Sequence, residues 1–146
     1  MPRIEVSTAI AAAPEQVWAH VADVTSHVEW MTDAEAIRLT SAQRSGEGTI
    51  FECDTRIGPF RLTDRMEITE WKEGEAMGVA HSGLVTGSGR FTLRPEAGGT
   101  RFTWVEDLRF PWWMGGPAGG VVGRRVLERV WRRNLRALRA GVEEGG

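Results

Sequence analysis

Alternation of apolar and polar residues dominates residues 4–10 and about 36–110, and it predicts strands rather than helices there. The opening segment, residues 4–10, alternates with a period of two, which is typical of a strand with one buried face. The same pattern, interrupted by glycine-rich turns, predicts six further strands near residues 35–41, 48–57, 60–71, 76–82, 86–94 and 100–110. Short turns favour antiparallel neighbours.

Helical spacing occurs in three places. Pro14 stands where the first turn of a helix tolerates proline, and apolar residues follow it at helical spacing. The Ser26-x-x-Glu29 pattern predicts the cap of a second short helix that ends near Trp30. The third helix, over residues 118–141, is long and amphipathic. Its inward face is predicted from positions four residues apart: Val122, Val126, Val130, Asn134 and Leu138.

The order of strand, two short helices, six strands and one long helix predicts an α+β fold. A seven-stranded antiparallel sheet with polar residues on one face can be covered only on the other face. We therefore expect a helix-grip fold, in which the sheet curls around the long C-terminal helix and the two short helices follow the first strand. A length of 146 residues with 41% hydrophobic content predicts a single domain over residues 1–146.

Composition narrows the classes of protein. The single cysteine, Cys53, excludes an internal disulfide and favours a reducing, cytoplasmic location. Glu5 interrupts the apolar stretch that a signal peptide would need, and no run approaches the 18 or so apolar residues of a membrane span. The three histidines show no metal-ligand spacing, and His20 and His27 are expected on the surface of the short helices. Gly87-Ser88-Gly89 lacks the pattern of a hydrolase nucleophile elbow. No metal or cofactor is expected.

Charge is unevenly distributed. The net charge is −2, yet residues 121–142 hold one acid, Glu128, against seven arginines, at positions 124, 125, 129, 132, 133, 136 and 139. Because the rest of the chain is acidic, we expect no nucleic-acid partner. A transient contact between the basic helix and an anionic membrane surface is one interpretation, and a simply solvated helix face is the other.

Several short motifs occur in an order found in a known family. They are Ala13-Pro14-x-x-Val17-Trp18 followed by Asp23 and Trp30, Gly46-x-Gly48-Thr49 at the start of a strand, Gly98-Gly99-Thr100-Arg101 before the last strand, and the closing helix. Over nearly its whole length the chain resembles the START-like (SRPBCC) superfamily, in particular its polyketide cyclase/dehydrase and lipid-transport branch. The resemblance implies a bacterial protein with a cavity between sheet and long helix that holds an apolar small molecule.

Strand alternation predicts which residues face that cavity. The predicted lining, with Trp30 and helix positions included, is mostly apolar and aromatic: Trp30, Phe51, Cys53, Phe60, Leu62, Met66, Met77, Val79, Phe91, Phe102, Trp104, Leu108, Val126, Val130 and Asn134. Such a lining is typical of a ligand pocket. Taken without the resemblance, the same residues are more typical of a filled core than of a cavity, with Asn134 as a hydrogen-bonded core amide.

Three ionisable residues have the same inward parity: Asp64, His81 and Glu106. Buried carboxylates with raised pKa values, together with a histidine, could orient or protonate a polar group on a ligand, so these three are the candidate catalytic residues. The alternative is structural. The carboxylates could pair with arginines such as Arg56, Arg90 or Arg109, or face water at a strand end.

Trp112 and Trp113, between the last strand and a glycine run, form the least expected segment. They are candidate ligand contacts, either as a gate over the cavity or as a membrane-docking element, and the alternative is that they plug one end of the core.

Two functions follow from these residues. The first is binding or transport of a hydrophobic small molecule, such as a lipid, polyketide or isoprenoid, by a monomer or homodimer. The second is an aromatase/cyclase or dehydratase that uses the polar cavity residues as acids and bases. The chain contains no tyrosine, which excludes any cyclase scheme that relies on a phenol. A third interpretation is a partner-binding protein whose Trp112-Trp113 loop closes on the ligand.

Overall fold

The structure is a computed structural model that describes residues 3–57, 59–83, 85–109 and 116–145. At residues 57, 60 and 116–123 only the backbone is described. The strands are β1 (Arg3–Ile10), β2 (Ala34–Leu39), β3 (Ile50–Ile57), β4 (Phe60–Lys72), β5 (Ala76–Ser82), β6 (Thr86–Glu96) and β7 (Gly99–Arg109). Helix α1 (Pro14–Val21) and the 3-10 helix η1 (Val24–Glu29) connect β1 to β2, and α2 (Gly116–Gly145) is the long C-terminal helix.

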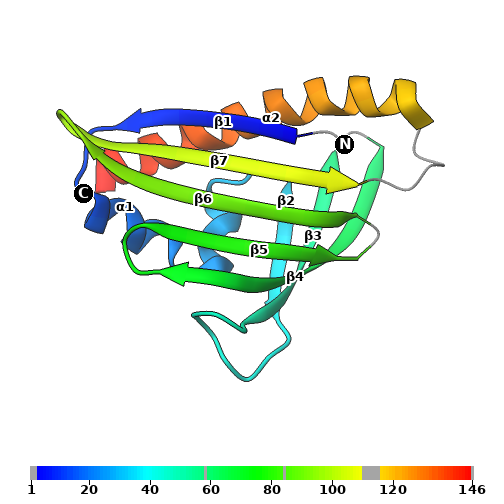
Figure 1. Cartoon of the computed structure of the whole chain (residues 1–146), viewed down its shortest axis with the longest axis horizontal. Coiled ribbons are helices and arrows are strands. Elements are labelled where there is room, and N and C mark those ends of the chain that lie inside the picture. Colours follow the sequence, from blue (N-terminus) through cyan, green and yellow to red (C-terminus); the bar gives the residue numbers. More distant parts are fainter. Residues whose placement is uncertain (1–2, 58, 84, 110–115, 146) are drawn as a thin grey trace.

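The strands form one antiparallel sheet in the order β1-β7-β6-β5-β4-β3-β2. Figure 1 shows the sheet curling from β1 round to β2, with α2 lying along β1. On the same side of the sheet, α1 contacts β6 and β7, and η1 contacts β2. The predicted α+β helix-grip fold is confirmed. Each strand begins and ends within two residues of its predicted bounds, and α2 is longer than predicted at both ends.

Register shifts bend the sheet at two places, near the start of β2 and between Ile68 and Glu70 of β4. A bulge inserts one extra residue into a strand and increases its local bend and twist. The shift in β4 lies beyond Asp64, so the inward parity of the first part of the strand is kept. After it Trp71 packs against the core, with its ring 5.1 Å from that of Trp18 in an edge contact.

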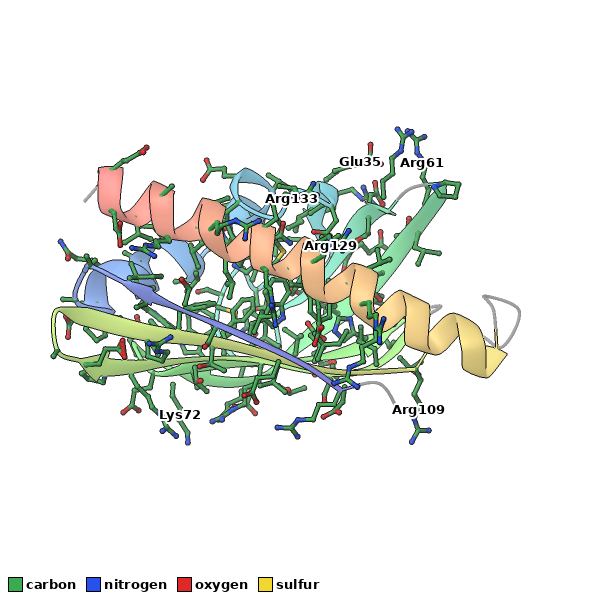
Figure 2. All side chains as sticks on the ribbon, turned by 90° about the horizontal axis from the view of Figure 1, so that it is seen from above. Glu35, Arg61, Lys72, Arg109, Arg129 and Arg133 are labelled. Atoms are coloured by element: carbon green, nitrogen blue, oxygen red, sulfur yellow. The ribbon has the colours of Figure 1, made fainter. Side chains whose placement is uncertain are left out.

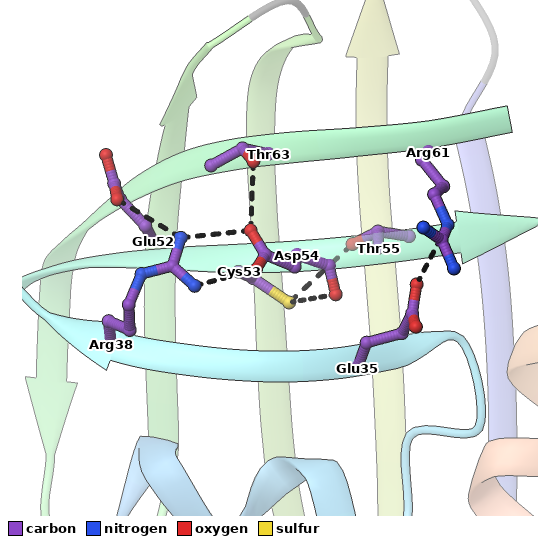
Figure 3. A network of polar contacts seen from close by, with 8 residues as sticks. All are labelled: Glu35, Arg38, Glu52, Cys53, Asp54, Thr55, Arg61 and Thr63. Carbon is purple, nitrogen blue, oxygen red and sulfur yellow. Dashed lines mark hydrogen bonds and ion pairs between the residues drawn. The ribbon is translucent and has the colours of Figure 1, made fainter.

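Charged residues connect β2, β3 and β4 on the convex face (Figure 3). Arg38 donates two hydrogen bonds to Asp54, of 2.6 and 2.9 Å, and a third of 3.3 Å to Glu52. Thr63 on β4 donates to the same Asp54 carboxylate at 2.9 Å. Exposed pairs of this kind add little stability. They do mark the solvent face, so a one-residue slip of a strand would bury charges and is disfavoured.

The short helical segment after α1 differs from its prediction in two respects. Asp23, not Ser26, caps η1, because its carboxylate accepts the Thr25 N–H at 3.0 Å. His27 is buried rather than on the surface, and its Nε2 lies 2.8 Å from the Val21 carbonyl oxygen. Burial lowers the pKa of His27 to about 4, so the ring is neutral at pH 7 and donates this hydrogen bond.

The inward face of α2 is rotated from the predicted one. Val126 is 42% exposed, and Val130 is only partly buried. The buried residues among the described side chains of α2 are Leu127, Trp131, Asn134, Leu135, Leu138 and Val142. A strict spacing of four drifts around a helix of 3.6 residues per turn, whereas spacings of three and four together stay on one side. Within the described ranges, no helix is long and apolar enough to cross a bilayer.

Candidate functional site

Asp64, His81 and Glu106 meet on the concave face of the sheet. His81 Nδ1 lies 2.7 Å from Asp64 Oδ2, and His81 Nε2 lies 2.8 Å from Glu106 Oε2. Both carboxylates therefore contact the same histidine. The structural interpretation from the sequence had paired them with arginines instead. Arg90, one of the arginines considered, donates to Glu70 instead.

Two glycines of β6 allow this contact. His81 is on β5 and Glu106 on β7, with β6 between them, so their backbones lie about 10 Å apart. In the ladder His81 faces Gly87, and Glu106 faces Gly89. A Cβ at Gly89 would lie 2.5–2.6 Å from the Glu106 carboxyl group, so glycine leaves the space that this group occupies. The Gly87-Ser88-Gly89 pattern was the sequence signal for this crossing, because glycines within a strand mark close approaches. Sequence reasoning used it only to exclude a hydrolase.

The electrostatics of the three residues favour a charged histidine. Burial alone would lower the pKa of His81, but hydrogen bonds to Asp64 and Glu106 and their negative charges raise it to about 10. The imidazolium then donates from both nitrogens. The second oxygen of Glu106 accepts the Nε1–H of Trp104 at 3.0 Å. The side chains of Asp64, His81 and Glu106 are 15%, 7% and 7% exposed.

An apolar cavity of about 50 Å³ lies beside Glu106, large enough for a few water molecules. Its lining is Val24, His27, Met31, Ile37, Phe51, Cys53, Met66, Met77, Val79, Gly89, Arg90, Phe91, Trp104 and Glu106. These residues come from six strands and from η1 with the turn after it. The cavity was predicted from the sequence to lie between the sheet and the C-terminal helix. Among the residues described, none of α2 lines it, so that placement is corrected.

An aromatic cluster lies between the described side chains of α2 and the cavity. Trp131 of α2 stacks on Trp104 of β7 with ring centroids 4.8 Å apart and planes at 24°, which occupies the space between helix and sheet. Trp30 and Phe91 extend the cluster, each with its ring within 6.0 Å of that of Trp104. Sequence reasoning missed Trp131 because it followed the Val126 stripe, although Trp131 lies four residues after Leu127.

The other predicted lining residues have different places. Trp30, Phe102 and Leu108 are buried in the core, and Leu62 and Val130 are partly buried against it. The side chain of Phe60, and Trp112 and Trp113, lie outside what the structure describes.

Asn134, predicted as a polar ligand contact, has its amide engaged within the protein. Its Oδ1 accepts from the backbone N–H and the hydroxyl of Thr32, both at 2.8 Å, and its Nδ2 donates to Asp33 Oδ1 at 2.8 Å. Burial raises the pKa of Asp33, although the Asn134 amide acts in the opposite direction. Asn134 thus ties α2 to the turn after η1, which carries one wall of the cavity.

Among the residues that the structure describes, two buried side-chain atoms have no hydrogen-bond partner, Trp30 Nε1 and Asp64 Oδ1. Such atoms are uncommon in folded proteins, since each costs free energy when it is left unpaired. In the described part of the chain, no group of three or more His, Cys, Asp or Glu side chains could hold a metal ion.

Comparison with known proteins identifies the family and agrees with the helix-grip fold. Residues 1–143 match the family described as polyketide cyclase/dehydrase and lipid transport. An uncharacterised protein of Mycobacterium tuberculosis is 26% identical over 134 residues, which cover 86% of this chain and 89% of that protein. A START superfamily protein from Mycobacterium smegmatis has a similar structure, with a TM-score of 0.81 at 14% identity and 99% of each chain covered. A Streptomyces aromatase/cyclase aligns with a TM-score of 0.73 at 16% identity, covering 97% of this chain and 93% of that one. These two likenesses show the fold.

Proposed function

Because the chain belongs to the polyketide cyclase/dehydrase and lipid-transport family, we propose that it binds a hydrophobic small molecule without chemically changing it. The site is the cavity between η1 and the concave face of the sheet. At about 50 Å³ it is smaller than a whole lipid, polyketide or isoprenoid, so a ligand of one of these classes must displace side chains that line it. The observation that carries the proposal is an apolar cavity whose lining includes one buried carboxylate, Glu106. Apolar walls with a few placed polar groups are typical of small-molecule sites.

Catalysis as an aromatase/cyclase or dehydratase is the alternative, and the grouping of Asp64, His81 and Glu106 favours it. Two features support binding instead. Both ring nitrogens of His81 are engaged by carboxylates, and with a pKa of about 10 the ring neither releases nor accepts a proton readily at pH 7. The chain also has no tyrosine to act as a phenolic acid.

Native mass spectrometry of protein purified without detergent, followed by organic extraction, tests the proposal. We expect an apolar compound bound to the native protein and a smaller bound fraction in Val79→Phe, because the larger side chain fills part of the cavity. Ala80→Phe is the matched control, since it adds the same ring to the next residue of β5, on the other face. The same spectra report whether the protein is a monomer or a homodimer.

A native protein that carries no compound and takes up none from an added lipid extract would contradict the proposal. Turnover of a poly-β-ketone substrate that is lost in Glu106→Gln would favour the enzyme instead.

A further inference from the structure

Glu106 presents a fixed negative group to the apolar cavity. It is the only carboxylate among the described residues that line the cavity, and its side chain is 7% exposed. Trp104 Nε1 and His81 Nε2 each donate to one of its oxygens, and Gly89 opposite leaves room for the group. A carboxylate has about four acceptor positions, so two remain for a guest in the cavity.

The positive charge of His81 does not fully neutralise Glu106. His81 carries one positive charge and is shared with a second carboxylate, Asp64. The three residues together hold one net negative charge, and Asp64 Oδ1 adds a further unpaired acceptor. Because this charge is shielded from water, a second anion in the cavity would be strongly disfavoured.

The other polar residues of the lining supply no compensating cation. His27 is neutral at pH 7, because burial lowers its pKa to about 4. Burial raises the pKa of the Cys53 thiol to about 11, so the thiol is also uncharged. The Arg90 side chain is 49% exposed, and its guanidinium group is already bound to Glu70.

We propose that the ligand of this cavity carries a hydrogen-bond donor, a hydroxyl or an amine, that binds Glu106, and that acids such as free fatty acids are rejected. This inference rests on the proposed function, since it needs a small molecule in the cavity. It adds the chemical class of the polar end, which apolar walls alone do not determine.

A matched series of small aromatic probes tests the inference in the native protein: toluene, benzyl alcohol, benzylamine and benzoate. Dissociation constants are measured at pH 7 by NMR titration of the tryptophan side-chain N–H signals. We expect benzyl alcohol and benzylamine to bind about threefold to tenfold more tightly than toluene, because they hydrogen-bond a charged group. Benzoate should bind at least about tenfold more weakly than benzyl alcohol.

Glu106→Gln keeps the shape of the side chain and removes the net charge of the three residues. In this variant we expect benzylamine to lose its preference over toluene and the penalty on benzoate to shrink by about threefold or more. The rest of that penalty, the cost of burying a carboxylate in an apolar cavity, remains. Asp107→Asn is the matched control, because it removes one negative charge from the next residue of β7, whose side chain is 40% exposed. The control should retain the native preference.

The outcomes separate the two proposals. If toluene binds and benzoate binds as tightly as benzyl alcohol, the inference is wrong and the proposed function stands. If benzylamine keeps its preference over toluene in a folded Glu106→Gln protein, Glu106 is not the acceptor and the inference is wrong. If no probe binds, toluene included, the proposed function is contradicted and the inference with it. Should Glu106→Gln fail to fold, the order of affinities in the native protein decides.

Discussion

The two histidines with buried side chains, His27 and His81, hold opposite protonation states at pH 7. His27 faces a backbone carbonyl and apolar neighbours, so burial lowers its pKa to about 4. His81 lies between Asp64 and Glu106, and their hydrogen bonds and charges overcome the effect of burial and raise its pKa to about 10. The difference arises from the neighbours of each ring, and it makes the stability of the fold depend on pH.

The stability contributed by His81 should be lost at alkaline pH. An unfolded histidine has a pKa near 6.5, so the contribution is complete below about pH 6.5 and disappears as the pH rises through about 10. We expect the free energy of unfolding to fall by about 3 kcal/mol between pH 7 and pH 10, because each pKa unit corresponds to about 1.4 kcal/mol. Urea denaturation at a series of pH values measures it.

A pair of histidine variants isolates this effect. His81→Gln should be less stable at pH 7 and should lose the decline between pH 7 and pH 10. His20→Gln, which changes an exposed histidine of α1, should keep the decline. A native protein whose stability is flat over this range would show that His81 is not held as the imidazolium.

At the scale of elements, β6 is the strand that lets Asp64, His81 and Glu106 come together. It contributes no polar side chain to the site, yet Gly87 and Gly89 let groups from β5 and β7 meet across it. Gly87 also has a positive φ of 126°, and a Cβ there would overlap the Asp107 carbonyl oxygen. On the other side of the cavity, η1 is held by the Asn134 amide of α2 through Thr32 and Asp33.

Gly89→Ala should detach Glu106 from its partners. The new methyl group would occupy the space of the carboxylate, so the hydrogen bonds from His81 and Trp104 must lengthen or break. We expect a loss of about 1–3 kcal/mol in the free energy of unfolding, the cost of leaving buried polar groups unpaired. Thermal and urea denaturation measure the loss, and a shift of the Trp104 N–H signal reports the broken bond.

Ser88→Ala is the control for this prediction. Ser88 lies between the two glycines, is exposed and has the opposite parity, so its replacement should change stability by less than about 0.5 kcal/mol. Equal effects of the two substitutions would mean that the space at Gly89 is not what positions Glu106.

At the scale of the whole molecule, charge is separated between α2 and the rest of the chain. The seven arginines of α2, from Arg124 to Arg139, are exposed, and Arg129 and Arg133 lie on its outer side (Figure 2). Val126, one of the few large apolar residues exposed in the described part of the chain, is on the same helix. An exposed basic face with an apolar residue suits an anionic lipid surface, which is the membrane contact predicted from the sequence.

We expect the protein to bind vesicles that contain phosphatidylserine, with an affinity that falls as salt is added, because exposed charges are screened. Replacing Arg129 and Arg133 by alanine should weaken co-sedimentation with the vesicles by about tenfold or more, at about 1 kcal/mol per basic residue. Replacing Arg65 and Arg94, exposed arginines of β4 and β6, is the control for net charge. Equal losses of vesicle binding in both double variants would indicate a general effect of net charge. If the native protein does not bind the vesicles at all, the basic face of α2 is simply solvated.

The sequence by itself determined the elements and, up to the bulges in β2 and β4, the face of the sheet on which a strand residue lies. A period of two assigns every strand residue to one face, so Asp64, His81 and Glu106 could be placed inward without knowledge of their neighbours. The same reasoning correctly predicted the seven strands and the helix-grip fold, because alternation and turn residues act locally.

Only the tertiary structure decided which of these residues touch. The contact of His81 with Glu106 joins two strands that are not neighbours, and it depends on glycines in the strand between them. Trp131 stacks on Trp104, so it lies on the buried face of α2. The cavity is lined by η1 and by no described residue of α2. These features depend on side chains brought together from distant segments, whereas periodicity describes one segment at a time.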